Sequence, residues 1–539
     1  MGVFQQILNP TGNLGATVAL ALIPLVVLLL LLAVFRITAW LSVIIASIVT
    51  FIIAVVVWQA PVGNALHAYV YGAATGVWSV DWITFWGVVI FNTLVVTGSF
   101  EKLQGWLIQQ ATADVRVQTL LLAWAFGALL EGLVGFGYPW ALVAPILITL
   151  GIRDLDAIRV AAIANNAPVS FGALGVPIIA LSAVTGLPLL ALSASIGKIV
   201  ALLALLPPWV LIYLVTGRRG LRDGWPLAIV GSLAYIAGQY PTSQYLGPYL
   251  PDIIGSIVCF AALLGLLKVW RPRTVLGFGG TPAEENVAYS EASRAPQLSG
   301  GELVRAFAPF IILLIVVVLW TGPWSPLPGV SLFSVEVQAR SAITHEAVSS
   351  TFNFAPFIGG TAILVSWIIM LAVLRPSAAD LRQVFSRTFS QMWGALLVGV
   401  FIFGLAYVFI YSGMAPSLAY GFSRIGPAFI VLAPILGWIG VALSGSNTST
   451  NTMFGAVQAT AGKLLGFPVL LAPSLGSVGA EVGKPVAPQT ASVGVSTSRF
   501  VRNEGEVIRH NMGWTLILLG YLIVVGLFYY FVLPGVMRL

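Results

Sequence analysis

The feature that most constrains this chain is a succession of apolar runs, most of them long enough to cross a lipid bilayer. A membrane-spanning helix needs about 20 mostly apolar residues. Runs of this kind cover residues 17–35, 37–58, 82–98, 187–216, 225–240, 253–269, 303–320, 356–374, 392–412 and 512–533. Two further regions, 119–183 and 425–496, are apolar but interrupted by Gly, Pro, Asn, Ser and Thr. The stretch 62–80 is rich in small residues and stays ambiguous: an interfacial or re-entrant segment is one interpretation.

Composition excludes several classes of protein. Of the 539 residues, 59% are hydrophobic and only 8% are charged, whereas about a quarter of the residues in a soluble domain are charged. This composition excludes a soluble enzyme, a disordered chain and a nucleic-acid binder. The single cysteine, Cys259, cannot form a disulfide within the chain. The run 17–35 has no basic segment before it, so it is interpreted as a retained helix rather than a secretory signal.

Short clusters of Lys and Arg between the runs predict which loops face the cytoplasm. The clusters near 218–222, 268–273, 375–387 and 499–509 all fall on that side if the chain begins outside and crosses about twelve times. The polar stretch 271–301 is then a flexible cytoplasmic linker. The predicted fold class is an all-α polytopic protein of the plasma (inner) membrane, with about 12 transmembrane helices and two re-entrant hairpins.

Similar features recur in the two halves of the chain and indicate an internal repeat. Trp86-Gly87 and Trp393-Gly394 each open an apolar run, 307 positions apart (393 minus 86). The predicted organisation is a first repeat over 1–216, with a hairpin at 119–150 and a broken helix at 155–183; an insertion of two helices and a linker over 217–301; and a second repeat over 302–539, with a hairpin at 425–465 and a broken helix at 467–496. The basic clusters orient the last helix of each repeat oppositely, so the repeats are predicted to be inverted, as in many secondary transporters.

The interruptions are where chemistry is expected. Irregular backbone is tolerated at membrane depth only where it is buried in protein or lines a watery cavity. The N-termini of half-helices carry positive partial charge, so four converging interruptions could hold an anion near the midplane. The alternative is that Gly and Pro are simply common in membrane helices.

Two sites in the first half carry polar groups at such interruptions. Glu131 lies in the run Glu131-Gly132-Leu133-Val134-Gly135-Phe136-Gly137. A carboxyl at membrane depth is costly when ionised, which makes Glu131 a candidate proton carrier; the alternative is a structural acid bonded to backbone N–H groups. Asn165 and Asn166 precede Pro168. They either bind substrate oxygens or cap a half-helix.

The second half carries more polar groups. The run 444–451 contains seven hydroxyl or amide side chains, among them the candidate ligands Ser446, Asn447 and Thr448. They suit a carboxylate, a hydroxyl or the coordination shell of a Na⁺ ion. Lys484 is a candidate point charge for a substrate carboxylate, or it forms an ion pair with Glu481 or Glu131. Gln489 lies in the same interruption.

Three other polar residues receive weaker assignments, and several functional patterns are missing. Lys198 is expected to face a protein partner, Lys463 to extend toward the interface and His67 to make an ordinary polar contact. The sequence contains no metal-ligand spacing, nucleotide-binding loop or nucleophile elbow. It therefore predicts neither an enzyme nor a bound metal or cofactor.

At these residues the sequence resembles the L-lactate permease family. The matching segments are Leu130-Glu131-Gly132…Gly135-Phe136-Gly137, Asn166-Ala167-Pro168-Val169…Pro177-Ile178, Ser446-Asn447-Thr448…Asn451, Gly483-Lys484…Pro488-Gln489 and Gly247-Pro248…Pro251-Asp252. The resemblance implies proton-coupled uptake of L-lactate, D-lactate and glycolate, within a superfamily of inverted-repeat carriers that move as elevators. It carries over Glu131, Asn166, Asn447, Thr448, Lys484 and Gln489 as site residues.

Two positions depart from the family pattern. Asn447 stands where some family members are expected to have Asp, which favours Glu131 as the proton carrier. Glu481 lies outside the recognised motif. The predicted function is therefore a secondary transporter for small 2-hydroxy monocarboxylates, driven by protons. Its predicted partners are a small carboxylate, protons and the lipid bilayer, with no nucleic acid; a homo-oligomer stays open. The alternatives are a Na⁺-coupled carrier and an uncoupled channel or facilitator.

Overall fold

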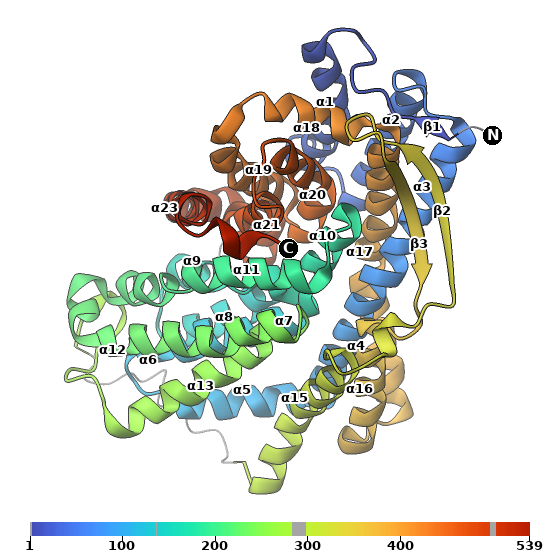
Figure 1. The fold of residues 1–539 in the computed structure, drawn as a ribbon. Coiled ribbons are helices and arrows are strands. Elements are labelled where there is room, and N and C mark those ends of the chain that lie inside the picture. The colour runs from blue at the N-terminus through green and yellow to red at the C-terminus, as the bar shows by residue number, and fades with distance from the viewer. Residues whose placement is uncertain (1–2, 136, 283–297, 496–502) are drawn as a thin grey trace.

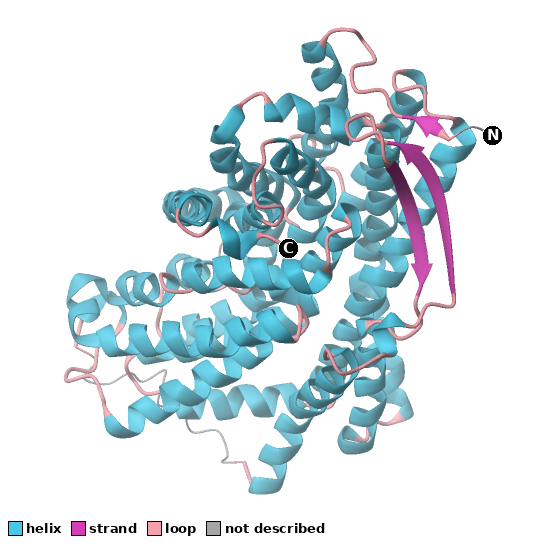
Figure 2. Cartoon of the chain, in the orientation of Figure 1, coloured by secondary structure: helices cyan, strands magenta, loops and turns pink. Residues whose placement is uncertain are grey.

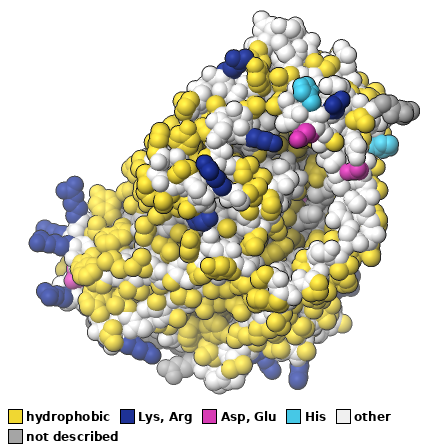
Figure 3. Space-filling model, viewed as in Figure 1, with side chains coloured by type: hydrophobic (Ala, Val, Ile, Leu, Met, Phe, Trp, Pro, Cys, Tyr) yellow, Lys and Arg dark blue, Asp and Glu magenta, His cyan; other side chains and the backbone are white. Residues whose placement is uncertain are grey.

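The computed structural model describes residues 3–135, 137–282, 298–495 and 503–539, and they are mostly helical (Figures 1 and 2). Within these residues, ten helices are long and apolar enough to cross a membrane, or eleven if one bent pair counts as a span. Large apolar side chains such as Ile48, Leu319 and Ile368 face outward from these helices, each more than half exposed. Figure 3 shows apolar side chains over most of one face, with Lys and Arg in small groups. The chain is a multi-pass membrane protein.

The helices of the first half follow in chain order. They are α1 (Leu14–Ala33), α2 (Ala39–Val56), α3 (Val62–Thr75), the π-helical η1 (Gly76–Asp81), α4 (Trp82–Val96), α5 (Ser99–Gln110), α6 (Val115–Gln118), the π-helical η2 (Thr119–Phe126), α7 (Gly127–Leu133), α8 (Tyr138–Thr149), α9 (Asp154–Ala164), the short η3 (Val169–Phe171), α10 (Gly172–Thr185), α11 (Leu189–Leu203), α12 (Pro207–Tyr245) and α13 (Pro251–Val269).

The second half begins after the short η4 (Phe278–Gly280). Its helices are α15 (Gly300–Thr321), η5 (Leu327–Gly329), α16 (Gly359–Leu374), α17 (Ala378–Ser412), α18 (Met414–Ser423), η6 (Gly426–Ala428), α19 (Phe429–Ser444), α20 (Asn447–Leu464), α21 (Leu471–Gly483), η7 (Lys484–Val486), α22 (Pro488–Val495), α23 (Glu504–Phe531) and η8 (Pro534–Met537).

Two long helical segments pack side by side along the molecule (Figure 1). Val62–Val96 and α17 are each 35 residues long, or about 52 Å at 1.5 Å per residue. Small residues let them approach closely, since a Cβ on Gly72 would lie 2.3 Å from the carbonyl oxygen of Phe403. The stretch 62–80, which the sequence leaves ambiguous, is therefore part of one long helical segment. The small side chains lower the apolar character of this stretch because they serve helix packing.

The predicted helical membrane fold is confirmed, and it carries one small sheet in addition. Three strands, β1 (Phe4–Gln5), β2 (Phe333–Arg340) and β3 (Ala347–Phe354), form a sheet in the order β1-β2-β3. β2 and β3 pair antiparallel, and β1 pairs parallel to β2 with Phe4 opposite Ala339. The sheet lies beside α3 (Figure 2). Alternating residues, with Val335 and Val337 in β2 and Val348 and Thr351 in β3, favour this strand pairing.

The segment from α11 to α12 is a hairpin rather than one straight helix. Gly217 has a left-handed φ of 66°, and hydrogen bonds between side chains and backbone connect the segments before and after it. The Ser193 hydroxyl donates to the Ser243 carbonyl. Further toward the turn, the Ser232 hydroxyl donates to the Leu205 carbonyl. These pairings are antiparallel, so 187–216 and 225–240 are separate legs, as predicted.

Four interruptions lie where the sequence predicts them. In the first, α7 ends at Leu133 and α8 begins at Tyr138. In the second hairpin, Gly445 and Ser446 separate α19 from α20, which run antiparallel. Between α9 and the segment 169–185 the chain bends by 67°. The fourth interruption is the short turn η7 between α21 and α22. Because α10 packs against α20, and α21 against α19 and α20, these elements form one cluster.

Candidate functional site

A buried ion pair joins the first interruption to the fourth. Lys484 Nζ lies 2.8 Å from Glu131 Oε1, and the two side chains are 7% and 2% exposed. Asn165 Nδ2 donates a 3.1 Å hydrogen bond to Glu131 Oε2. Both carboxylate oxygens of Glu131 therefore have a partner. Of the two acids proposed for Lys484 from the sequence, Glu131 is the one it contacts.

A small cavity, hereafter the polar cavity, lies beside this pair. Its volume is about 50 Å³, more than the roughly 10–15 Å³ that one water molecule requires. All four interrupted elements contribute to its lining, which consists of Glu131, Gly135, Val169, Gly172, Ala173, Pro177, Gly445, Ser446, Asn447, Thr448 and Lys484. The four interruptions therefore converge on one cavity that is larger than a single water molecule needs, as an anion site between half-helices requires.

Close backbone packing shapes the polar cavity. A Cβ added to Gly172 would lie 2.6 Å from Glu131 Oε1, so only glycine leaves room for the carboxyl group. The next residues, Ala173 and Leu174, adopt left-handed conformations with φ of 46° and 60°. Such conformations are costly for residues with a Cβ and are commonly held in place at functional sites. The start of α10 is therefore built around Glu131.

The second hairpin presents a helix N-terminus and unpaired amides. Ser446 Oγ caps α20 by accepting a hydrogen bond from the Ser449 N–H at 3.1 Å. Both polar atoms of the Asn447 side chain are buried without a hydrogen-bond partner among the described residues, and the same holds for Asn166. A buried amide group without a hydrogen-bond partner costs about 1–3 kcal/mol, so a group of this kind in a native structure is expected to have a role of its own.

The structure brings together most of the predicted site residues. Glu131, Ser446, Asn447, Thr448 and Lys484 line the polar cavity, and Asn165 bonds Glu131. Asn166 is fully buried but is not part of the lining. Gln489 lies just outside it, against Gly445.

The three residues with weaker assignments lie elsewhere. Lys198 Nζ donates to the Val536 carbonyl at 2.8 Å, so its partner is a protein group, as expected, but a backbone one. His67 stacks on the Tyr71 ring. Lys463 lines a separate cavity of about 890 Å³ that Ser341 and Glu346 also border.

The predicted insertion supplies residues that sequence reasoning missed. The Tyr235 hydroxyl donates a 2.8 Å hydrogen bond to Asp252 Oδ1, and both residues are buried. A Cβ on Gly132 would lie 2.7 Å from the Cβ of Asp252, so Asp252 packs directly against the helix that carries Glu131. The available signal was an acid at the start of an apolar run, which is a functional candidate by default.

Glu481 also has a place in the cluster. The Ser170 hydroxyl donates to Glu481 Oε2, which ties α21 to η3. The other oxygen, Oε1, is buried without a hydrogen-bond partner in the part of the chain that the structure describes. Glu481 therefore links the second and fourth interruptions and does not pair with Lys484.

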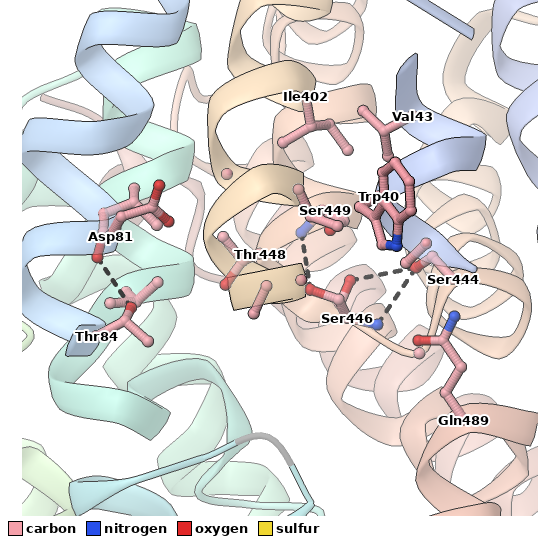
Figure 4. Close-up of a pocket in the computed structure, with 18 of the residues that line it drawn as sticks. Trp40, Val43, Asp81, Thr84, Ile402, Ser444, Ser446, Thr448, Ser449 and Gln489 are labelled. Atoms are coloured by element: carbon pink, nitrogen blue, oxygen red, sulfur yellow. Dashed lines mark hydrogen bonds between the residues drawn. The ribbon is translucent and has the colours of Figure 1, made fainter. Parts of the chain in front are cut away.

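A larger pocket, hereafter the vestibule, adjoins the polar cavity. Its volume is about 360 Å³, and it shares Gly445, Ser446 and Thr448 with the polar cavity. Helices α1, α2, α4 and α17 form the opposite wall. Figure 4 shows Trp40, Val43 and Ile402 on that wall, facing the hydroxyls of Ser444 and Ser446 and the amide of Gln489.

The same chain matches known proteins over nearly its whole length. The family model described as L-lactate permease matches residues 17–534. The chain belongs to the L-lactate permease family. Glycolate permease GlcA of Escherichia coli (strain K12) is 33% identical to it, with 100% of each chain covered. The L-lactate permease of the same organism is 30% identical, with 96% of each chain covered. The L-lactate permease of Bacillus subtilis (strain 168) is 31% identical, over 94% of this chain and 95% of the relative.

A solved structure is also similar to this permease. The Alcanivorax borkumensis YdaH transporter aligns with a TM-score of 0.45 and 15% sequence identity, covering 88% of each chain. Membership of a permease family makes the chain a membrane transporter and not an enzyme.

Proposed function

We propose that this permease takes up small 2-hydroxy monocarboxylates, L-lactate, D-lactate and glycolate among them, across the plasma membrane together with protons. The relatives are named for lactate and glycolate. The observation that carries the proposal is the buried pair of Glu131 and Lys484 beside a cavity lined by four interrupted helices.

The ion pair supplies a mechanism of coupling. Glu131 neutralises Lys484 at 2.8 Å. When a proton binds Glu131, that carboxyl no longer holds Lys484, and the ammonium group becomes available to a substrate carboxylate. One proton and one monocarboxylate anion then leave the net charge of the site unchanged. Binding of each therefore favours binding of the other, which is the reciprocal coupling a symporter needs.

The remaining groups fit the rest of a 2-hydroxy acid. The N-terminus of α20 lies at the second hairpin tip. The N-terminus of a helix has N–H groups without partners inside the helix and favours a bound anion. Ser446, Thr448 and the unpartnered amide of Asn447 can bond the 2-hydroxyl group. A small substrate suits a small polar cavity, because few groups must lose their hydration.

Element bounds support the proposal of two repeats. Val62–Val96 and α17 have equal length, and their first residues are 316 positions apart (378 minus 62). Gly98 and Gly413, 315 positions apart (413 minus 98), both begin a helix in the left-handed conformation. We propose that the repeats are inverted and that the interrupted elements move against α1–α4 and α17 as an elevator.

The test is uptake of radiolabelled L-lactate into proteoliposomes under imposed gradients. Symport with protons predicts accumulation above equilibrium when the lumen is alkaline, without any Na⁺ gradient. Accumulation that follows only a Na⁺ gradient would instead favour a cation shell at the Ser446–Thr448 tip. Equilibration without accumulation under either gradient would indicate a facilitator.

A further inference from the structure

We propose that the vestibule is a subsite for the side chain of the substrate, so that the permease accepts 2-hydroxy monocarboxylates with apolar side chains larger than the methyl group of lactate. This inference rests on the proposed function, because it assumes that the carboxylate binds at Lys484. It goes further by assigning a ligand to the larger of the two adjoining spaces.

The shared border of the two spaces is the first argument. The polar cavity and the vestibule share Gly445, Ser446 and Thr448, so the hairpin tip borders both. The polar cavity holds about 50 Å³ and the vestibule about 360 Å³. A substrate anchored by its carboxylate beside Lys484 and by its hydroxyl at the hairpin tip can extend additional carbon atoms past that tip toward the larger vestibule.

The chemistry of the far wall is the second argument. Apart from Thr84 and Asp81, the lining from α1, η1, α4, α2 and α17 is made of apolar side chains or glycine, among them Leu28, Trp40, Val43, Ile402 and Phe403. Contact between this apolar wall and a hydrocarbon side chain of the substrate removes apolar surface from water, which favours binding. Each methylene group that becomes fully buried strengthens binding by up to about fourfold.

Charge is the third argument. No Lys, Arg or His lines the vestibule in the part of the chain that the structure describes. Among the described lining residues, Asp81 is the only one with an ionisable side chain. Asp81 packs against Gly399 of α17, and its Oδ2 is buried without a hydrogen-bond partner among the described residues. Figure 4 places Asp81 near Thr84, across from the hairpin tip. A second carboxylate on the substrate would meet no cation and one acid, so dicarboxylates should be rejected.

A competition series tests the inference on the intact permease. Uptake of radiolabelled L-lactate is measured against unlabelled glycolate, lactate, 2-hydroxybutyrate, 2-hydroxy-3-methylbutyrate, 3-phenyllactate and malate. We expect half-inhibitory concentrations equal to or lower than that of lactate for the acids with longer apolar side chains, and at least about tenfold higher for malate. Longer acids that fail to compete, or malate that competes as well as lactate, would overturn the subsite.

A matched pair of variants locates the effect. Val43→Phe fills the vestibule from α2, whereas Ile48→Phe makes a similar change on the same helix at a position 55% exposed on the outer surface. We expect Val43→Phe to raise the half-inhibitory concentration of 2-hydroxy-3-methylbutyrate relative to lactate by roughly tenfold, and Ile48→Phe to leave that ratio unchanged. An unchanged ratio in Val43→Phe would count against the proposal.

Two controls keep the outcomes distinct. If Val43→Phe impairs uptake altogether, binding is compared instead, from the thermal stabilisation of the purified permease by lactate and by the branched acid. The ratio of the two affinities is then the readout. If the unaltered permease does not transport lactate, the proposed function fails; if it transports lactate but ignores longer acids, only the subsite fails.

Discussion

Lys484 Nζ and Glu131 Oε1 are 2.8 Å apart although the residues are 353 positions apart in the chain. The pair is buried and joins η7 to α7, so it connects an interruption in each half of the permease. Two charges in such surroundings are stable only together, because removing one partner leaves an uncompensated buried charge. The pair therefore serves both the stability of the site and the proposed exchange of a proton for a substrate anion.

Replacing Glu131 by Gln is expected to separate exchange from accumulation. The amide is neutral, like the protonated acid, so Lys484 remains free to bind lactate on both sides of the membrane. Counterflow of labelled lactate should persist, and uptake driven by a pH gradient should fall to background. The exposed Glu336 on β2 supplies the matched control, Glu336→Gln, which should transport normally. Uphill uptake that survives in Glu131→Gln would remove Glu131 from the coupling step.

Replacing Lys484 by Met is expected to lower both affinity and stability. Glu131 would lose its cation, and breaking a buried pair typically costs about 3–5 kcal/mol. The double variant Glu131→Gln with Lys484→Met removes both charges and should recover much of the lost stability. Thermal unfolding in detergent measures the stability of the two single variants and of the double variant. Additive losses in the double variant would show that the two residues do not stabilise each other.

Replacing Gly172 by Ala is expected to displace the Glu131 carboxyl group, because it adds a Cβ to the backbone that packs against this group. The new Cβ would lie 2.6 Å from Glu131 Oε1 and force the carboxyl group away from Lys484. Overpacking of this kind costs about 1–3 kcal/mol, and pH-driven uptake should fall strongly in a protein that still folds. Gly265→Ala on α13 has open space around it and should behave like the unaltered permease. Normal uptake by Gly172→Ala would mean that the start of α10 does not position Glu131.

The hydrogen bond from Tyr235 to Asp252 is expected to stabilise the packing of Asp252 against α7, the helix that carries Glu131. Tyr235→Phe and Asp252→Leu each remove the same bond, so their effects on unfolding should overlap in the double variant by about 1 kcal/mol or more. Tyr240→Phe, on the same helix but 40% exposed, should change stability by less than about 0.5 kcal/mol. A coupling energy of zero between Tyr235 and Asp252 would contradict this role.

Much of the architecture could be predicted because a bilayer restricts what the backbone can do. Apolar length identifies the spans, and polar or small residues inside apolar runs identify the four interruptions, which separate α7 from α8, α9 from α10, α19 from α20 and α21 from α22. The same reasoning selected Glu131, Asn447 and Lys484, which all line the polar cavity. The same reasoning left 62–80 ambiguous, because small residues that serve helix packing resemble interfacial sequence. It did not anticipate the strand pairing at 333–354, because that pairing joins separate segments.

The sequence by itself determined which segments are membrane helices and where they break, because those properties depend on neighbouring residues and on the hydrogen-bonding needs of the backbone in lipid. The tertiary structure alone decided that Lys484 pairs with Glu131 rather than Glu481, that Asp252 supports α7, and that the vestibule opens onto the hairpin tip. Each of these relationships depends on how distant helices pack, and the periodicity of a single segment carries no information about its partner.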